Sequence, residues 1–509
     1  MKKYDVAICG YGPVGSVCSL LLAQYGLNVL VIDKNNGPSL TARAINTDAE
    51  QLRVFDKFDI GNEVVKNSNQ IEKVHFSNSN LEPIQSLNQP LGESIMGWPN
   101  QVLFYQPELE SFIREKVNDY KNINVIESCE LIDFENLNES VNIKCIKNDE
   151  ILTFNSKFLI GCDGASSFIR KTLDIELDDF GYNQKWLVCD AHLTKNIDLK
   201  NELIQVCDPT RPCTFLHGRR GHLRFEFKVM PDDNLNDLKD KDFIWNLLSP
   251  WINKNNANLE RSVIYNFHAC IANKWHKKNI FIAGDSAHQM PPFMGAGMGT
   301  GIRDVANLSW KINLVLKKTA KSDILKTYQN ERYPHAKWTI AQTVSIGEII
   351  EGFCAAEEGK EFIPKKKGYD VKFPHIPSGI YTNPADKISG YQVPQPNVLF
   401  DKKFIGLDKL IKSEFSIITK SNINKINDKA NRIIKKLKIK IIHISNEDDP
   451  EGRLKKIFNK YDYILVRPDL YVYGGAKKDN LSNMIESLKD SFSLNIKYYF
   501  KTFFFLIIK

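Results

Sequence analysis

The spacing of hydrophobic residues changes twice near the N-terminus and predicts a strand, a helix and a second strand. Tyr4 to Cys9 is an apolar run of strand length, Ser16 to Tyr25 has helical spacing, and Asn28 to Ile32 is a second apolar run. This order is typical of a parallel βαβ unit, in which a loop after the first strand meets a ligand.

That loop carries a GxGxxG sequence, Gly10-Tyr11-Gly12-Pro13-Val14-Gly15. Its first glycine permits a tight turn, its second lets a pyrophosphate approach, and its third allows the helix to pack closely on the strand. Asp33 ends the second strand, where a carboxylate can accept hydrogen bonds from ribose hydroxyls. We therefore expect dinucleotide binding here.

Two later stretches repeat the change from a strand to an acidic turn. Lys157 to Arg170 is a strand that ends in Gly161-Cys162-Asp163-Gly164, although an Asp-Gly turn alone is common. Asn279 to Lys311 is a strand that ends in Gly284-Asp285, followed by a Pro/Gly loop and a helix start. Free amides at a helix start favour an anion. We expect both turns beside one cofactor, and a surface loop is the alternative for the second.

The middle of the chain predicts an antiparallel sheet. Leu223, Phe225, Phe227 and Val229 alternate with Arg224, Glu226 and Lys228, which is typical of a strand with one buried face. The predicted strands are Ile71 to Ser77, Lys185 to Leu193, Leu203 to Cys207, Thr214 to Gly218, His222 to Met230 and Val263 to Ile271.

The C-terminal part follows a helical stretch, Ser322 to Ile350, and a Pro/Gly-rich link, Phe373 to Val398. Beyond the link, strands and helices are predicted to alternate at Glu414 to Thr419, Ala430 to Leu437, Ile439 to Ile444, Arg453 to Phe458, Tyr463 to Val466 and Leu470 to Tyr473. The last residues, Tyr498 to Lys509, are apolar but too few to span a membrane, so burial, self-association and interfacial contact stay open.

Composition excludes several classes. The ten cysteines are scattered without metal-type spacing, so neither a disulfide framework nor a metal site is expected. No signal sequence precedes the first strand, and we expect a cytoplasmic enzyme. The net charge of +7 is spread over 509 residues and predicts no nucleic-acid partner.

The order of GxGxxG, the Asp163 turn and the Asp285 turn resembles the FAD-dependent class A aromatic hydroxylases, and within them 3-(3-hydroxyphenyl)propionate hydroxylase and its relatives. Supporting runs extend to about residue 490. The resemblance implies an α/β fold with an α+β substrate sheet: a Rossmann-like FAD-binding domain, an inserted β-sheet substrate domain and a C-terminal thioredoxin-like domain. Because that last domain has no cysteine, dithiol chemistry is excluded there.

The domain boundaries then follow. We expect the FAD-binding domain at 1–70, 100–180 and 270–345, the substrate domain at 71–99 and 181–269, the helix end and linker at 346–395, the thioredoxin-like domain at 396–495, and the apolar tail at 496–509.

The resemblance also implies the cofactor contacts residue by residue. They are Gly10, Gly12, Pro13, Val14, Gly15, Asp33, Lys34, Arg43, Gln106, Asp163, Gly284, Asp285, Pro292, Gly295, Gly297 and Met298. Arg43 offers a planar cation to the pyrophosphate or the ribityl chain, and the amides of Gly297 and Met298 can stabilise the flavin N1/O2 edge.

The implied activity is hydroxylation of a phenolic ring with NADH or NADPH, O2 and FAD, through a flavin C4a-hydroperoxide. The base that activates the phenol is unassigned, with His217, Arg219, Arg224 and His288 as candidates. The phenol, the ring position and the nicotinamide cofactor stay open, as do a homodimer and membrane contact by the tail. Alternatives are a polyketide-type or resorcinol-type phenol hydroxylase and a non-catalytic flavin or aromatic-ligand binding protein. A flavin halogenase is disfavoured because no WxWxIP run is present.

Overall fold

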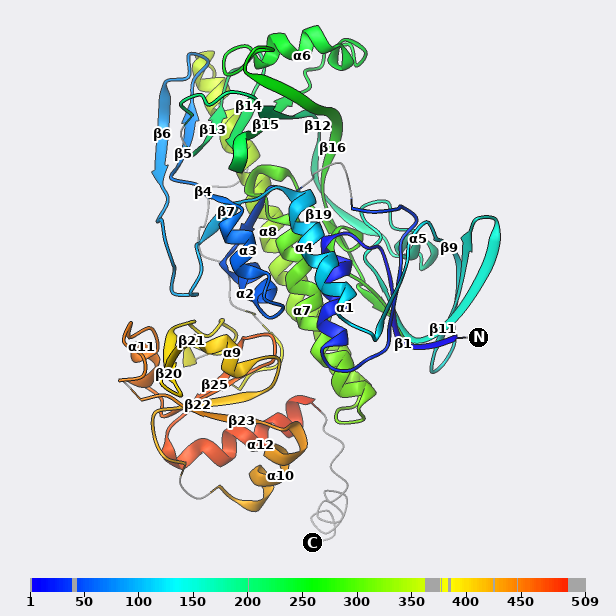
Figure 1. Ribbon diagram of the computed structural model, residues 1–509, viewed down its shortest axis with the longest axis vertical. Helices are drawn as coiled ribbons and strands as arrows, with labels where there is room; N and C mark the ends of the chain where they lie inside the picture. Colours follow the sequence, from blue (N-terminus) through cyan, green and yellow to red (C-terminus); the bar gives the residue numbers. More distant parts are fainter. Residues whose placement is uncertain are drawn as a thin grey trace. The chain divides into compact units, whose positions relative to one another are not determined.

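The computed structural model describes residues 2–38, 44–199, 201–361, 376, 378–382, 386–423, 426–445 and 447–492 (Figure 1). Arg43, the tail at 498–509 and part of the predicted linker lie outside them. The chain forms two compact units. Unit 1 comprises Met1–Ser94, Trp98–Val305 and Ala336–Phe373, and unit 2 comprises Ile95–Gly97, Ala306–His335 and Pro374–Lys509.

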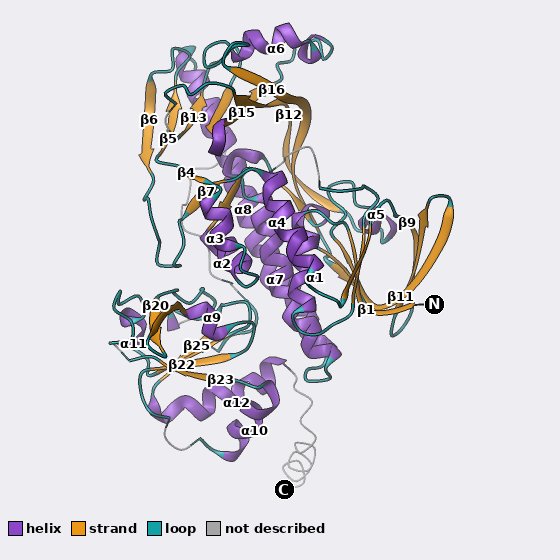
Figure 2. Cartoon of the chain, in the orientation of Figure 1, coloured by secondary structure: helices purple, strands orange, loops and turns teal. Residues whose placement is uncertain are grey.

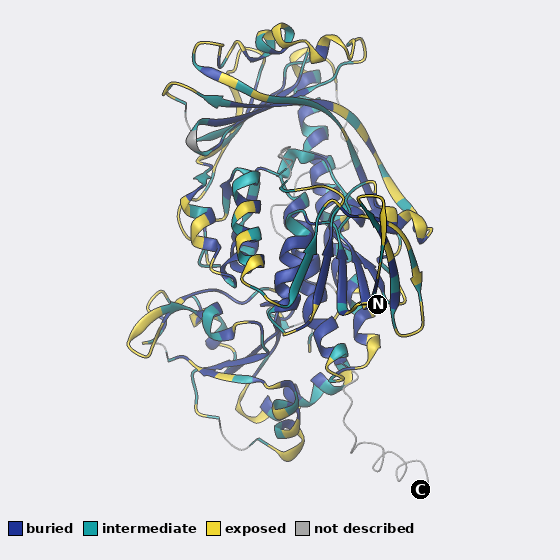
Figure 3. Ribbon diagram, turned by 45° about the vertical axis from the view of Figure 1, so that its right-hand side comes forward, coloured by how far each residue is buried: buried dark blue, intermediate teal, exposed yellow. Residues whose placement is uncertain are grey.

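The first sheet of unit 1 is mostly parallel and has the order β17-β18-β11-β1-β2-β8, with β10 and β9 attached antiparallel to β11. Its strands are β1 (Lys2–Cys9), β2 (Val29–Ile32), β8 (Ile123–Ile126), β9 (Glu130–Asn136), β10 (Val141–Lys147), β11 (Glu150–Gly161), β17 (His276–Lys277) and β18 (Ile280–Ile282). Helices α1 (Pro13–Ala23) and α4 (Gln106–Asn118) pack together beside it (Figure 2). Every residue of β2 is buried, which explains its unbroken apolar run. Figure 3 colours each residue of the chain by how far it is buried.

The second sheet of unit 1 has the order β19-β16-β12-β15-β14-β13-β5-β6 and is called the substrate sheet below. Its strands are β5 (Lys73–Ser77), β6 (Pro83–Asn88), β12 (Leu177–Leu193), β13 (Glu202–Val206), β14 (Cys213–His217), β15 (His222–Lys228), β16 (Ala257–Ala272) and β19 (His288–Gln289). All six predicted strands are present. Two of them, β12 and β16, begin several residues before their expected starts and pair along almost their whole length.

Short elements complete unit 1. A small sheet of order β3-β7-β4 joins the segments before and after the first hairpin of the substrate sheet. The remaining elements are β3 (Asn46–Asp48), β4 (Asn69–Gln70), β7 (Gln101–Leu103), α2 (Ala49–Asp56), α3 (Gly61–Lys66), α5 (Phe168–Thr172) and α6 (Lys241–Leu248). Helices α7 (Gly297–Leu316) and α8 (Lys326–Glu357) contribute residues to both units.

Unit 2 contains a four-stranded sheet of order β23-β22-β24-β25, in which only β22 and β23 are parallel. Its elements are β20 (Asn397–Phe400), β21 (Lys403–Gly406), α9 (Leu407–Ile411), β22 (Ser416–Thr419), α10 (Asp428–Leu437), β23 (Lys440–His443), α11 (Lys455–Phe458), β24 (Tyr463–Val466), β25 (Val472–Ala476) and α12 (Leu481–Phe492). The predicted alternation is present, while the thioredoxin-like assignment and the domain boundaries stay predictions. None of the helices in the described part of the chain is long and apolar enough to cross a membrane.

Candidate active site

The loop between β1 and α1 has the shape that a dinucleotide requires. Gly10 has φ +105°, and a Cβ there would lie 2.2 Å from the carbonyl oxygen of Cys162. A Cβ at Gly15 would lie 1.9 Å from the carbonyl oxygen of Gly10, whereas one at Gly12 would meet nothing within 4 Å. Any side chain at Gly10 or Gly15 would therefore clash with the backbone of the protein. The space beside Gly12 is open, so a ligand can approach the backbone there.

Asp33, at the end of β2, holds this loop in place. Its carboxylate accepts hydrogen bonds from the backbone N–H groups of Tyr11, at 2.6 Å, and Asn35, at 2.8 Å. A carboxylate has about four acceptor positions, so Asp33 can also accept from ribose hydroxyls. Lys34 is exposed beside it.

Arg114 on α4 closes the other side of the loop. Its guanidinium lies 4.1 Å from the ring centroid of Tyr11, donates to the carbonyl oxygens of Tyr11 and Gly37, and pairs with Glu127 at 2.7 Å. Burial raises the pKa of Tyr11 to about 12, although Arg114 opposes the rise. The sequence motifs did not point to Arg114, because no spacing rule links α4 to the GxGxxG loop.

The Asp163 turn is tied to the Asp285 turn. Asp163 accepts hydrogen bonds from the hydroxyls of Ser167, at 2.6 Å, and Ser286, at 3.0 Å, and from the backbone N–H of Ile169, at 3.1 Å. The two acidic turns thus lie side by side, as expected. Direct contact of Asp163 with the cofactor stays a prediction.

Asp285 follows β18 on a short helical turn, Gly284–Ser286. Its side chain is half-buried, and none of the described residues donates a hydrogen bond to it. Gly284 has φ +63° and packs against Val14, and its N–H donates to the carboxylate of Asp304 at 3.2 Å. The Asp285 carboxylate is therefore available to hydroxyl groups of a ligand.

The Pro292–Gly299 loop leads into α7 and carries the other expected contacts. Pro292–Met294 forms a 3-10 turn, and Gly295 follows in the left-handed conformation at φ +58°. A Cβ at Gly297, the first residue of α7, would meet nothing within 4 Å. The first amides of an α-helix have no carbonyl partner within it. The N–H groups of Gly297 and Met298 can therefore stabilise a negative charge at the N-terminal end of this helix.

Two buried polar atoms without partners border this loop. Asn46 Oδ1 and Gln51 Nε2 are buried and make no hydrogen bond within the described structure. A Cβ at Gly295 would lie 2.7 Å from Asn46 Cβ, and one at Gly299 would lie 2.8 Å from the Gln51 amide. A flavin edge, which alternates donors and acceptors, would satisfy both atoms. Together with the open side of Gly12, these atoms show that the residues present fit FAD.

Gln106, the first residue of α4, is buried and binds protein groups. Its Oε1 accepts the backbone N–H of Ala44 at 2.7 Å, and its Nε2 donates to Glu110 at 2.7 Å. It thereby positions the segment that follows Arg43, which lies outside the described residues.

The two faces of the substrate sheet differ in kind. On β15, Leu223, Phe225 and Phe227 pack in an apolar core that also contains Ile244 and Leu248 of α6. Because side chains alternate along a strand, Arg224, Glu226 and Lys228 lie on the opposite face, called the polar face below. Arg224 is nevertheless only 1% exposed and Glu226 only 6% exposed. The sequence predicted the alternation correctly but not the burial of the polar side.

One end of the polar face holds a buried ion cluster around Asp190 of β12. Its carboxylate accepts from Arg224 Nε at 2.8 Å, Arg261 at 2.5 Å and His222 Nε2 at 3.1 Å. Burial alone would raise the pKa of Asp190, but Arg224 and His222 outweigh it and hold that pKa well below its ordinary value. Burial lowers the pKa of His222 despite its bond to Asp190, so this imidazole is neutral at pH 7.

The other end of the polar face is aromatic. The Trp186 ring lies 5.4 Å from that of Phe293, which belongs to the Pro292–Gly299 loop, and Tyr182 lies 6.1 Å from Phe293. Beside them, Lys228 pairs with Glu351 of α8 at 3.1 Å. The loop expected at the flavin and the substrate sheet thus meet through aromatic contacts.

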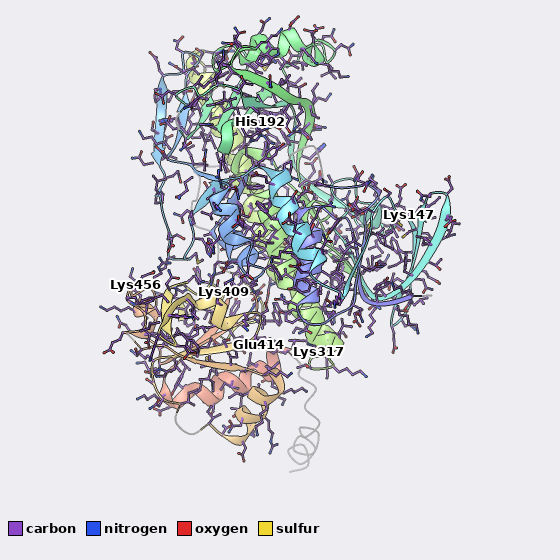
Figure 4. All side chains as sticks on the ribbon, viewed as in Figure 1. Lys147, His192, Lys317, Lys409, Glu414 and Lys456 are labelled. Atoms are coloured by element: carbon purple, nitrogen blue, oxygen red, sulfur yellow. The ribbon has the colours of Figure 1, made fainter. Side chains whose placement is uncertain are left out.

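The four candidate bases lie in different surroundings. Arg224 belongs to the ion cluster, and His217 ends β14. Arg219 donates to Asn67 at 3.0 Å. His288 is buried behind the Asp285 turn, with Nε2 2.7 Å from Asp304. The structure does not bring the four together. Figure 4 labels His192 of β12, whose ring lies 5.2 Å from that of His222 and which pairs with Glu260 at 2.9 Å.

Among the described residues, no group of three or more His, Cys, Asp or Glu side chains is arranged to hold a metal ion.

Comparison with known proteins identifies the family. A model of the FAD binding domain matches residues 3–343, and a model of the HcaD C-terminal domain matches residues 390–491. The fold and the site define an FAD-dependent aromatic hydroxylase, as the motif order predicted. The chain belongs to the family of the FAD binding domain.

Its relatives include a probable NADH-specific resorcinol 4-hydroxylase from Rhodococcus jostii (strain RHA1), which is 30% identical over 76% of this chain and 74% of the relative. A 3-(3-hydroxy-phenyl)propionate/3-hydroxycinnamic acid hydroxylase from Shigella sonnei (strain Ss046) is 28% identical over 96% of this chain and 95% of the relative. Among solved structures, the flavin-dependent monooxygenase PieE, in complex with FAD and substrate, has a TM-score of 0.83 at 17% identity, covering 96% of this chain and 99% of that one. This last likeness concerns the fold alone.

Proposed function

We propose that the protein hydroxylates a phenolic ring, using NADH or NADPH and O2. The observation that carries this proposal is the polar face of the substrate sheet, where aromatic rings and buried hydrogen-bonding groups adjoin the loop that fits FAD. A phenol requires both a flat apolar surface and a partner for its hydroxyl. The names of the relatives, which act on resorcinol or on hydroxyphenylpropionate, support the same substrate class.

The residues divide the work by position. FAD, when bound, carries electrons from the nicotinamide cofactor and activates O2. Asp33 and Asp285 would hold its hydroxyl-bearing chain, and the first amides of α7 would stabilise negative charge on the ring system. Trp186 and Phe293 would exclude water from the reacting atoms. NADH and NADPH both remain open.

The proposal also includes the location of the protein, the fold of its C-terminal region and its assembly. All ten cysteines are free thiols in the structure, which supports a reducing, cytoplasmic location. The order and directions of the four strands in unit 2 support the thioredoxin-like assignment of that region. We also propose that the protein forms a homodimer.

Substrate-stimulated oxidation tests the function. The purified yellow protein is mixed with NADH or NADPH in air and a panel of phenols that includes resorcinol and 3-(3-hydroxyphenyl)propionate. We expect at least one phenol to accelerate both NAD(P)H and O2 consumption and to give a product heavier by one oxygen atom. Binding of phenols without any stimulation or product would instead indicate the non-catalytic alternative.

A further inference from the structure

Glu226 lies where the two halves of the polar face meet. On β15 it stands between Arg224, in the ion cluster, and Lys228, beside the aromatic end. Its cross-strand neighbours are Val188 of β12 and Thr214 of β14, neither of which carries a charge. A ring stacked at the aromatic end would therefore bring a hydroxyl group toward this carboxylate.

Glu226 is buried, and its carboxylate has no hydrogen-bond donor among the described residues. The residue is only 6% exposed, and the groups that shift its pKa act through burial and charge rather than through a hydrogen bond. Its neighbours are committed elsewhere: Arg224 and Arg261 bind Asp190, and Lys228 binds Glu351. Because a buried polar group without a partner is costly, this carboxylate is suited to a donor that the protein does not supply.

We propose that Glu226 accepts a hydrogen bond from the ring hydroxyl of the substrate and takes its proton during hydroxylation. This role rests on the proposed function. The O–H bond of the phenol breaks, an O–H bond forms on Glu226, and the electron pair left on the oxygen activates the ring carbons ortho and para to it. One oxygen atom of O2 then bonds to one of these carbons as a hydroxyl group. When the ring regains aromaticity, the C–H bond at that carbon breaks and its proton goes to the other oxygen atom of O2, which leaves as water. Glu226 returns its own proton to the first ring oxygen and is again a carboxylate.

The same surroundings select an uncharged phenol. Within the described part of the polar face, Arg224 and Arg261 share the carboxylate of Asp190, and Lys228 pairs with Glu351. The negative charge of Glu226 balances the second arginine, so a substrate carboxylate would add a negative charge that no cation compensates. A neutral di- or polyhydroxylated ring adds no such charge.

Titration of Glu226 suits proton transfer near neutrality. Burial raises its pKa to about 7, although Arg224 and Arg261 oppose the rise and Asp190 adds to it. The other charged or titratable groups facing this region are Lys228, Glu351, Tyr182, His222 and Tyr265, whose hydroxyl accepts a hydrogen bond from Arg261 at 2.9 Å. A base with a pKa close to the working pH is more effective than an ordinary carboxylate.

The test compares Glu226→Gln with Glu202→Gln, which removes a carboxylate from β13 of the same sheet. Glu202 pairs with His75 at 3.2 Å and does not belong to the ion cluster around Asp190. We expect Glu226→Gln to lower kcat for hydroxylation by about 10² to 10⁴, with a much smaller change in KM, while Glu202→Gln matches the wild type. NAD(P)H oxidation by Glu226→Gln should continue with little hydroxylated product.

A pH profile separates proton transfer from a structural role. For the wild type, kcat/KM should rise as the pH passes about 7, because Glu226 must lose its proton to act as a base. Glu226→Gln should lack this inflection, and Glu226→Asp should restore it in part. Glu226→Asp also keeps the test decisive if Glu226→Gln fails to bind FAD, since loss of the inflection in a folded, yellow Asp variant would contradict the role.

Substrate charge gives the last readout. Resorcinol should exceed 3-(3-hydroxyphenyl)propionate in kcat/KM by at least about tenfold, because the carboxylate of Glu226 repels the carboxylate of the propionate. A better rate with the propionate would overturn the substrate selection. If the wild type hydroxylates phenols but Glu226→Gln keeps its kcat and coupling, this inference fails alone. If no phenol stimulates the wild type, the proposed function fails.

Discussion

Two buried ionic clusters, one in each unit, differ in whether their hydrogen bonds are complete. In unit 2, Lys311 and Arg467 face Glu331 and Asp469, so the formal charges cancel. Arg467 donates to both carboxylates, at 2.5 to 3.1 Å, and Lys311 Nζ lies 2.9 Å from Glu331. Trp310 and Asn307 supply further donors, so every carboxylate oxygen of this cluster has a partner.

In unit 1, the cluster around Asp190 is equally buried and its charges also cancel when Glu226 is counted, but Glu226 itself has no hydrogen-bond donor among the described residues. Asp190 receives donors from Arg224, Arg261 and His222, whereas Glu226 receives none from the described residues. Removing the charged groups from water costs free energy in both clusters. Only in the unit 2 cluster do hydrogen bonds within the protein reach every carboxylate and offset that cost. A closed cluster indicates a structural role, and an incomplete one indicates a ligand.

Breaking the closed cluster should have the largest effect. Arg467→Met removes the cation that bridges Glu331 and Asp469 and should lower the free energy of unfolding by about 3 to 5 kcal/mol, because two carboxylates are left buried with one lysine. Chemical denaturation measures the loss. Lys429→Met, on an exposed position of α10, serves as the control and should change little.

Adding Glu331→Met to Arg467→Met should recover part of the stability, since the remaining Lys311 and Asp469 carry opposite charges. If Arg467→Met alone costs less than about 1 kcal/mol, a value typical of surface ion pairs, the cluster does not hold unit 2 together.

The sequence predicted the order of elements and the three cofactor motifs because these depend on local spacing. Gly10, Gly15 and the acidic turns are set by contacts that recur wherever a strand enters a helix through a tight turn. Helix α7, for which the sequence indicated a start after the Pro/Gly loop, begins at Gly297, where Thr300 N–H donates to the carbonyl of Ala296 at 2.9 Å.

The sequence did not predict which buried polar groups lack a hydrogen-bond partner. Alternation on β15 shows which residues share a face, but not what covers that face. The pattern alone therefore indicates a wet face for Arg224 and gives Glu226 no role beyond the alternation. Phe293 and Glu351, which contact Trp186 and Lys228 on the polar face, are far from β15 in the chain. The sequence did not indicate Asn46 and Gln51 as site residues, because their neighbours in the Pro292–Gly299 loop are also far away in the chain. The Asp48–Gln51 capping box was a local signal only of the start of α2.

The incomplete cluster should respond to pH in a way that the closed one does not. Burial raises the pKa of Glu226 from 4.5 to about 7, so the folded protein holds a proton that the unfolded chain has released. The free energy of unfolding of the wild type should therefore fall, relative to that of Glu226→Gln, as the pH rises from about 4.5 to 7. Since one pKa unit corresponds to about 1.4 kcal/mol, the fall should reach up to about 3 kcal/mol.

Unfolding of both proteins at pH 5 and pH 8 checks this sign. The two should be similar at the lower pH, and Glu226→Gln should be the more stable at the higher pH. An equal difference at both pH values would mean that Glu226 has an ordinary pKa and a partner of its own. Such a result would remove the contrast between the two clusters.

The smallest expected effect concerns Gln51, whose Nε2 is the unpartnered donor beside the α7 start. Gln51→Leu removes that donor together with the capping box of α2, in which Gln51 Oε1 accepts the N–H of Asp48 at 2.9 Å. Asp48→Ala breaks the same capping box but keeps the Gln51 amide. Both variants should lose about 1 kcal/mol or more of stability without FAD. Only Gln51→Leu should also bind FAD about tenfold more weakly, as expected for one lost hydrogen bond. Flavin titration of both apoproteins measures this, and equal affinities would place the Gln51 donor outside the cofactor site.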